Sequence, residues 1–378
     1  MLGNSIRLFS VRGIDVGIHF SWFIIFGLVT YSLGTAYFPD RIPGISGPEA
    51  LLLGAVASVL LFVSVLVHEL AHSFMARARG LDAKSITLFL FGGVSNLGGE
   101  AKRPSTEFLV AIVGPLTSFV IAGLSFGAAL VLTEPRAREI AAYLTFINVA
   151  LGLFNLLPGF PLDGGRVFRA IVWNATGSVR RATEVAAFAG KLIAYAFFAW
   201  GFVQVLGGNL LGGIWIAAIG WFLQNAASSS LQQVILDQRL KDVLVGHVMR
   251  RDPTAVAPGI SVAELIEDHL LPGNRRAMPV VDNTRLVGVV TLGDVTSVPA
   301  AERAATPVGQ VMGGRDGMVT VVPSDTLRKA VDGLGSGDYE QLPVVEDGQL
   351  VGMLTRADVM RQIQLREALN LEGRAVAD

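Results

Sequence analysis

Residues 60–80 read LLFVSVLVHELAHSFMARARG, an apolar run that contains two histidines and a glutamate. On a helix, His68 and His72 lie four residues apart and share one face, while Glu69 is turned by about 100° from His68 around the axis. This is the H-E-x-x-H pattern, in which two imidazoles hold Zn²⁺ and the glutamate polarises an attacking water. Ionisable groups at membrane depth are costly and usually mark function. The stretch therefore predicts a zinc site within a membrane-spanning helix.

The composition divides the chain into two domains. Of the 378 residues, 52% are hydrophobic, 16% are charged and none is cysteine, whereas soluble domains carry about 25% charged residues. Residues 1–230 hold 15 Lys+Arg and 11 Asp+Glu, and residues 231–378 hold 15 and 20. The composition excludes a disordered chain, a disulfide scaffold and cysteine chemistry, and the net charge of −1 gives no reason to expect nucleic-acid binding. We expect a membrane domain at 1–230 and a cytosolic domain at 231–378.

Apolar stretches in the first domain predict six transmembrane helices, since about 20 residues cross a hydrocarbon core. With the amino terminus inside, the inner loops hold twelve Lys and Arg and the outer loops three. This bias predicts a multi-pass protein of the cell membrane with both termini in the cytoplasm. The predicted spans are residues 18–38, 50–76, 108–132, 140–157, 187–206 and 211–227.

A third zinc ligand is needed, because catalytic zinc normally has three protein ligands and one open position. Residues 154–170 read FNLLPGFPLDGGRVFRA and place Asp163 directly after the fourth predicted span. The prolines and the glycines at 159, 164 and 165 predict irregular backbone and a re-entrant bend there. A turn-forming Asp-Gly at the membrane surface is the alternative, and the incomplete zinc site favours a ligand.

HELAH on one span and LDG after a later one resemble the site-2 protease family of intramembrane zinc metalloproteases, over about residues 5–228. The resemblance implies one Zn²⁺ per chain, held by His68, His72 and Asp163, with Glu69 as the catalytic glutamate. It also places Asn155 where the family has an asparagine that stabilises substrate or oxyanion. A polar residue satisfied between helices is the alternative for Asn155.

Three further features bear on this site. Residues 81–99, LDAKSITLFLFGGVSNLGG, predict a β-hairpin or re-entrant loop whose free edge binds an extended substrate; an amphipathic connector is the alternative. The pair Gly114-Pro115 resembles a family motif, but Ser118 stands where an asparagine is expected. His19, at the start of the first span, is either an interfacial anchor or a third imidazole near the metal.

The second domain contains an internal repeat. MPVVDNTRLVGVVTLGDV (278–295) matches LPVVEDGQLVGMLTRADV (342–359) at a constant offset of 64. The pattern resembles a tandem CBS-domain (Bateman) module, with repeats at about 240–298 and 304–364. The expected fold is therefore a polytopic α-helical membrane protein, with six transmembrane helices and a re-entrant β-loop, joined to an α/β tandem CBS domain.

The resemblance to CBS pairs implies that the strand-end T-x-x-D residues bind the ribose of ATP or AMP. These residues are Thr291 with Asp294, and Thr355 with Asp358. Carboxylate oxygens suit a ribose diol, but the same aspartates can simply cap the helices that follow. CBS pairs that act only in homodimerisation are a further alternative.

The leading hypothesis is an enzyme that hydrolyses a peptide bond of a membrane-spanning client protein. The resemblance implies regulated intramembrane proteolysis in a prokaryote, with an anti-sigma factor or a membrane-tethered pro-protein as client and with the CBS pair as regulator. A CBS-gated membrane transporter or channel is the alternative, although conduction does not call for HELAH together with LDG. A catalytically dead scaffold is disfavoured because the four chemical positions are intact.

Overall fold

The computed structural model of the chain describes residues 5–99, 101–240, 243–251, 253–273, 275–314, 318–335 and 341–369. The chain forms two compact units, residues 1–233 and 234–378. We predicted that both termini are cytoplasmic. Both chain ends lie outside the described residues.

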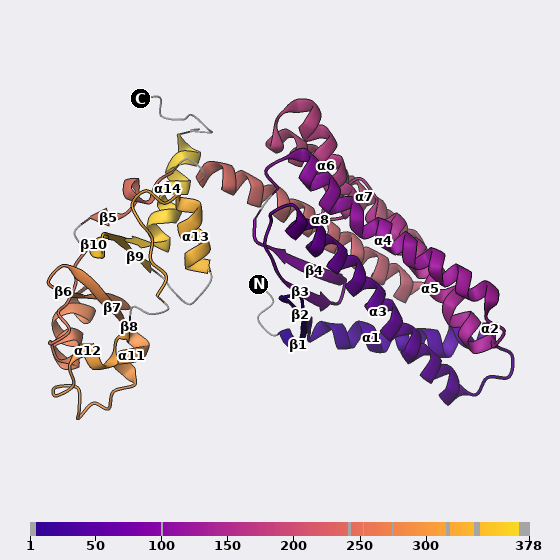
Figure 1. The fold of residues 1–378 in the computed structure, drawn as a ribbon, viewed down its shortest axis with the longest axis horizontal. Coiled ribbons are helices and arrows are strands. Elements are labelled where there is room, and N and C mark those ends of the chain that lie inside the picture. Colours follow the sequence, from indigo (N-terminus) through magenta and orange to yellow (C-terminus); the bar gives the residue numbers. More distant parts are fainter. Residues whose placement is uncertain are drawn as a thin grey trace. The chain divides into compact units, whose positions relative to one another are not determined.

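Among the described residues, six helical segments of the first unit are long and apolar enough to cross a membrane. They confirm the predicted number of spans, and the ribbon shows the long helices of this unit running beside one another (Figure 1). The helices are α1 (Ser21–Ser32), which continues through a π-helical turn (Leu33–Tyr37) into α2 (Phe38–Arg41), α3 (Gly47–Ala78), α4 (Pro104–Val131), α5 (Pro135–Asn155), α7 (Val179–Leu206) and α8 (Leu210–Leu240).

Small residues let the first two spans pack closely. A Cβ on Gly54 of α3 would lie 2.6 Å from the Thr30 carbonyl oxygen, and a Cβ on Gly34 would lie 2.8 Å from the Leu51 Cα. Close backbone approach at small residues is the usual basis of helix association in membranes, where lipid tails are as apolar as the side chains. This contact fixes one face of α3, the helix that carries H-E-x-x-H.

A four-stranded sheet accompanies these helices in the order β1-β2-β3-β4. Strands β2 and β3 are parallel, and the outer pairs are antiparallel. The β-hairpin expected at 81–99 is present as β3 and β4, and its re-entrant position in the membrane stays a prediction. The strands are β1 (Ser5–Val11), β2 (Ile14–His19), β3 (Ala83–Phe89) and β4 (Gly92–Leu97).

The predicted start of the first span at residue 18 is wrong. His19 ends strand β2, and helix α1 begins at Ser21. Val16 and Ile18 are buried in the sheet, 1% and 7% exposed, so their apolar character belongs to a strand.

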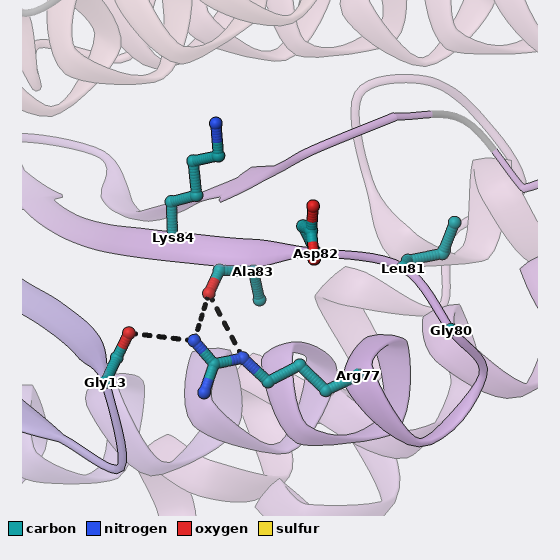
Figure 2. A pocket seen from close by; sticks show the side chains of 7 residues that line it. All are labelled: Gly13, Arg77, Gly80, Leu81, Asp82, Ala83 and Lys84. Atoms are coloured by element: carbon teal, nitrogen blue, oxygen red, sulfur yellow. Dashed lines mark hydrogen bonds between the residues drawn. The ribbon is translucent and has the colours of Figure 1, made fainter.

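Arg77, in the last turn of α3, holds the sheet to that helix. Its guanidinium donates hydrogen bonds to the carbonyl oxygens of Arg12 (2.5 Å), Gly13 (2.8 Å) and Ala83 (2.6 Å). Figure 2 shows Arg77 between Gly13 and Ala83, with Lys84 on the opposite side of the strand. These residues line a cavity of about 520 Å³ that does not include the histidines of α3. Arg77 thus has a structural role beyond its positive charge.

Asp163 begins a regular helix, α6 (Asp163–Thr176), so the expectation that Gly164 and Gly165 prevent helix there is wrong. A Cβ on Gly165 would collide with the carbonyl of Gly159, and one on Gly164 would collide with the backbone of Leu156. The two glycines therefore let the first turn of α6 pack directly on the preceding bend. This packing outweighs the low helix propensity of glycine.

A buried ion pair joins α6 to α4. Arg169, 8% exposed, donates through Nε to Glu107 Oε1 at 2.5 Å, and Glu107 is fully buried. The Arg169 guanidinium also lies over the Phe160 ring, 5.3 Å from its centroid. Arg169 is one of the twelve Lys and Arg assigned to the inner loops, but it is an interior group that fixes the helix carrying Asp163.

The second unit repeats one arrangement twice. Strands β6 and β7 form one antiparallel pair and β9 and β10 another, joined in a sheet of order β5-β10-β7-β6 with β8 beside β7. Separate apolar cores surround Val280 in the first half and Val344 in the second. The strands are β5 (Arg250–Arg251), β6 (Ala277–Asp282), β7 (Arg285–Thr291), β8 (Gly313–Gly314), β9 (Gln341–Glu346) and β10 (Gln349–Thr355).

Short helices complete each half of this unit (Figure 1). They are the 3₁₀ turn Val245–His247, α9 (Val262–Glu264) with a π-helical segment (Leu265–Leu270) and α10 (Leu271–Gly273), α11 (Leu292–Thr296), α12 (Val308–Val311), α13 (Leu327–Gly335) and α14 (Arg356–Ala368).

The Glu107–Arg169 pair yields a stability prediction. Replacing Arg169 with Met leaves the buried Glu107 carboxylate without its guanidinium, and breaking a buried pair costs about 3–5 kcal/mol. Thermal unfolding of the purified protein in detergent should therefore shift to a clearly lower temperature in Arg169→Met. The control is Arg166→Met on the same helix, where the half-exposed side chain makes no hydrogen bond to the described residues. Equal unfolding temperatures of the two variants would contradict the assignment.

Candidate metal centre

Two helices bring His68, His72 and Asp163 together. His68 and His72 lie one turn apart on α3, and Asp163 is the first residue of α6. Each Nε2 lies 3.1 Å from Asp163 Oδ2, and the two Nε2 atoms lie 3.1 Å from each other. The histidines are 3% and 4% exposed. Three donor atoms therefore form a buried triangle with nearly equal sides, from residues more than 90 positions apart in sequence.

Helix α4 orients both imidazoles from behind. His72 Nδ1 lies 2.6 Å from the Val110 carbonyl oxygen, which can only accept a hydrogen bond. The proton of a neutral His72 is therefore on Nδ1, and Nε2 presents its lone pair to the triangle. His68 Nδ1 lies 2.9 Å from Ser118 Oγ. Partners of this kind on the second ring nitrogen are typical of metal-binding histidines.

The expected family asparagine is replaced by Ser118, and the structure shows that this serine still contacts the site. The motif alone does not predict that Ser118 is the partner of His68. The Gly114-Pro115 pair four residues earlier was the available signal that this face of α4 lies near the histidines.

Gly114 of α4 lets the backbone of that helix pack directly against the donor atoms. A Cβ built on Gly114 would collide with His72 Nε2 and would lie 2.7 Å from His68 Nε2. Any side chain at this position would therefore displace the imidazoles. The glycine is required by the geometry of the triangle, because it lets the backbone of α4 approach both Nε2 atoms.

Glu69 is half-buried and contacts strand β4. Its Oε2 accepts a hydrogen bond from Ser95 Oγ at 2.6 Å, and Ser73 Oγ donates to Ser95 Oγ at 3.4 Å. A Cβ on Gly93 would lie 2.5 Å from Glu69 Cγ, so the backbone of β4 passes directly over this side chain. Glu69 thus lies on the same helix as the histidines, outside the donor set, with one carboxylate oxygen held in place by Ser95.

Asn155 ends α5 and is half-buried, and its side chain makes no hydrogen bond to any described residue. The structure instead shows a buried asparagine that the sequence analysis missed. Asn148 Nδ2 donates to Ser64 Oγ at 3.2 Å, one turn before His68 on α3. Since Asn155 follows Asn148 by seven residues, both share one face of α5. His19 is not part of the triangle, and its Nδ1 lies 2.8 Å from Ser21 Oγ.

In the second unit, both T-x-x-D pairs cap helices. Thr291 and Asp294 form a reciprocal capping box at the start of α11, and Thr355 and Asp358 make the same contacts at α14. Asp358 also binds Arg250. Burial raises the pKa of the Asp358 carboxyl, but the hydrogen bonds from Thr355 and Arg250 outweigh burial and lower it below its usual value.

Family models match both parts of the chain. The model "Peptidase family M50" matches residues 56–136 and 132–197, which include the whole donor triangle. The model "CBS domain" matches residues 245–301 and 308–365. A solved site-2 protease from Methanocaldococcus jannaschii is 29% identical over 60% of this chain and 95% of that chain, with a TM-score of 0.43.

Curated relatives match over almost their full length. Rip3 of Mycobacterium tuberculosis (strain Erdman), which bears the designation of a zinc metalloprotease, is 36% identical over 96% of this chain and 93% of its own. Zinc metalloprotease MJ0392 of M. jannaschii is 30% identical over 97% of this chain and 98% of its own length. These matches favour the enzyme over a CBS-gated transporter. The chain belongs to peptidase family M50 and is a multi-pass intramembrane zinc metalloprotease of the site-2 protease type with a tandem CBS module.

Proposed function

We propose that His68, His72 and Asp163 bind one catalytic Zn²⁺, and that the enzyme uses it to cut a membrane-spanning client protein. The observation that carries this proposal is the donor triangle with sides of 3.1 Å. Donor atoms around a tetrahedral zinc with bonds of 2.0–2.1 Å lie about 3.3 Å apart. The triangle matches that spacing closely, and three protein ligands leave a fourth position free.

The chemistry of the donor set also fits zinc. Two imidazole nitrogens and one carboxylate oxygen are ligands found in catalytic zinc sites. In the absence of a cation, lone pairs of two neutral imidazoles and a carboxylate would face one another in a buried space, which is unfavourable.

When bound, zinc supplies a Lewis acid that lowers the pKa of a bound water and polarises the scissile carbonyl. Glu69 takes the proton from the attacking water and delivers it to the leaving amine. The hydrogen bond from Ser95 holds one carboxylate oxygen of Glu69, which fixes the direction in which the other oxygen faces. Glu69 therefore acts as general base and then as general acid.

Asn155 is proposed to donate a hydrogen bond to the developing oxyanion. Asn148 contacts Ser64 on α3, and α3 and α5 are alternate spans that run in the same direction. Seven residues further along α5, Asn155 is thus expected at the level of the second metal-binding turn of α3. An amide that makes no hydrogen bond within the described residues is free to contact the substrate.

The client is proposed to be an anti-sigma factor or a membrane-tethered pro-protein, cut near the cytoplasmic surface. A helix that rises about 1.5 Å per residue crosses a hydrocarbon core of about 30 Å in about 20 residues. Counted from Gly47, where α3 begins, His68 lies at the far edge of that core. With the predicted orientation, in which both termini are cytoplasmic, this edge faces the cytoplasm.

Strand β4 is proposed to bind the client as an added strand. It lies at the end of the sheet order and passes directly over Glu69. Peptide hydrolysis requires an extended substrate, and an open strand edge can hold one by main-chain hydrogen bonds. A peptide added at this edge would run beside the general base.

The CBS pair is proposed to regulate the protease by binding an adenine nucleotide such as ATP or AMP, through Thr291 and Asp294 or through Thr355 and Asp358. The carboxylates can accept hydrogen bonds from a ribose diol. Homodimerisation through the pair is the other regulatory role to test, by the mass of the detergent-solubilised protein in light scattering.

The metal assignment predicts two different phenotypes. His68→Ala or Asp163→Ala removes a ligand and should reduce the zinc content of the purified protein from about one per chain to well below one. Glu69→Gln should keep the zinc and abolish cleavage of a co-expressed client, because an amide cannot take the proton. Metal analysis and immunoblotting measure these outcomes. Cleavage by Glu69→Gln would refute its assigned role.

Gly114 provides a steric test of the same site. Gly114→Ala places a methyl group against both Nε2 atoms and should abolish zinc retention. The matched control is Gly123→Ala on the same helix, where a Cβ meets nothing within 4 Å and zinc should be retained. Full zinc occupancy in Gly114→Ala would show that the ion binds elsewhere.

Ser118 offers a smaller perturbation. Ser118→Ala removes the partner of His68 Nδ1 and should weaken zinc binding by about 10–100-fold, as measured by competition with a chelator. Thr117→Ala is the control, since among the described residues Thr117 Oγ1 bonds only its own helix, at the Val113 carbonyl. Equal zinc affinity of the two variants would mean that Ser118 does not orient His68.

A further inference from the structure

The two halves of the CBS pair differ beside their candidate ribose-binding aspartates. In the second half, Arg250 donates from Nε to both oxygens of Asp358, at 3.0 and 3.1 Å, and from Nη2 to Oδ1 at 3.0 Å. In the first half, Asp294 makes no ion pair with any described residue; its carboxylate accepts hydrogen bonds from Thr291. The internal repeat shows which residue of the first half corresponds to Arg250.

The pseudo-symmetry equates Arg250 with Gly313. Strand β5 pairs with β10 through Arg250 and Met353, and strand β8 pairs with β7 through Gly313 and Val289. The preceding residues, Met249 and Met312, also correspond to each other. A Cβ on Gly352 would lie 2.7 Å from Met249 Sδ, and a Cβ on Gly288 would lie 2.7 Å from Met312 Sδ. The basic residue that covers one aspartate is thus replaced by glycine over the other.

The hydrogen-bond capacity of the two carboxylates differs as a result. A carboxylate has about four lone-pair sites. Asp294 uses Oδ2 for the Thr291 amide and hydroxyl, both at 2.7 Å, and its Oδ1 accepts no hydrogen bond from the described residues. Oδ1 can therefore accept from the hydroxyls of a ribose. Asp358 has the same two bonds from Thr355 and, in addition, the bidentate guanidinium.

Displacing Arg250 would also be costly. Asp358 is 6% exposed, and although the Arg250 side chain is 59% exposed, their ion pair is a charge-assisted, two-point contact. A neutral ribose diol that replaced the guanidinium would leave the buried carboxylate without its cation. The Asp294 half carries no such cost.

We propose that the CBS pair binds one adenine nucleotide per chain, at Thr291 and Asp294, and that Arg250 closes the pseudo-symmetric site at Asp358. This inference rests on the proposed nucleotide binding by the pair and specifies its stoichiometry and place. Regulation then depends on a single asymmetric site.

The test changes Arg250 and its counterpart Gly313 in the full-length protein in detergent. Binding of AMP and ATP to each variant is measured by equilibrium dialysis. The wild type should bind one nucleotide per chain. Arg250→Gly should open the second site and raise the stoichiometry to two, and Arg250→Gly/Asp358→Asn should return it to one. Arg251→Gly, at the neighbouring residue of β5, is the matched control and should stay at one.

The reciprocal variants act on the open site. Gly313→Arg should weaken binding at Asp294 by at least about tenfold, corresponding to about 1.4 kcal/mol. The position accepts a side chain, because the nearest atom to a Cβ there is the Val289 carbonyl oxygen at 3.5 Å. Asp294→Asn keeps an acceptor for the helix cap and should weaken binding to a similar degree.

Three results would overturn the inference. Two nucleotides per wild-type chain would show that Arg250 does not close its site. Loss of all binding in Arg250→Gly would make Arg250 a nucleotide ligand instead. No binding of either probe to the wild type or to Arg250→Gly would refute the nucleotide role itself, while the zinc content and Glu69→Gln tests of the protease would stand unaffected.

Discussion

The meeting of α3 and α6 at the donor triangle is the contact on which the functional architecture depends. His68 and His72 are fixed by the periodicity of one helix, but Asp163 must be delivered from another helix more than 90 residues away. Several features far apart in sequence position Asp163 next to the histidines. Gly164 and Gly165 let α6 begin directly at the bend, and the buried Glu107–Arg169 pair ties α6 to α4.

Helix α4 has the central supporting position. Within about three turns it supplies the carbonyl that fixes the tautomer of His72, the hydroxyl beside His68 and the glycine at which its backbone packs against both rings. A mainly apolar span can thus determine the chemistry of a site to which it contributes no ligand. The same logic extends to the sheet, because β4 holds Glu69 through Ser95 while Arg77 holds the sheet to the end of α3.

The fold class and the main candidate residues could be predicted from the sequence because they depend on short-range patterns. H-E-x-x-H is a spacing on one helix, and the spans are runs of apolar residues. What could not be predicted depends on partners distant in sequence. Nothing in the sequence around Arg169 identifies Glu107, and nothing around Ser118 identifies His68. The last two residues of the strand at 14–19 were assigned to the first span because buried strand and membrane helix are both apolar over so short a length.

The central claim is that zinc is bound by two imidazoles and one carboxylate at the junction of α3 and α6. X-ray absorption at the zinc edge of the purified full-length protein tests it most directly, since multiple scattering counts imidazole ligands. We predict nitrogen and oxygen ligands at about 2.0–2.1 Å, with scattering from two imidazoles. A third imidazole, or a shell without imidazole scattering, would contradict the account.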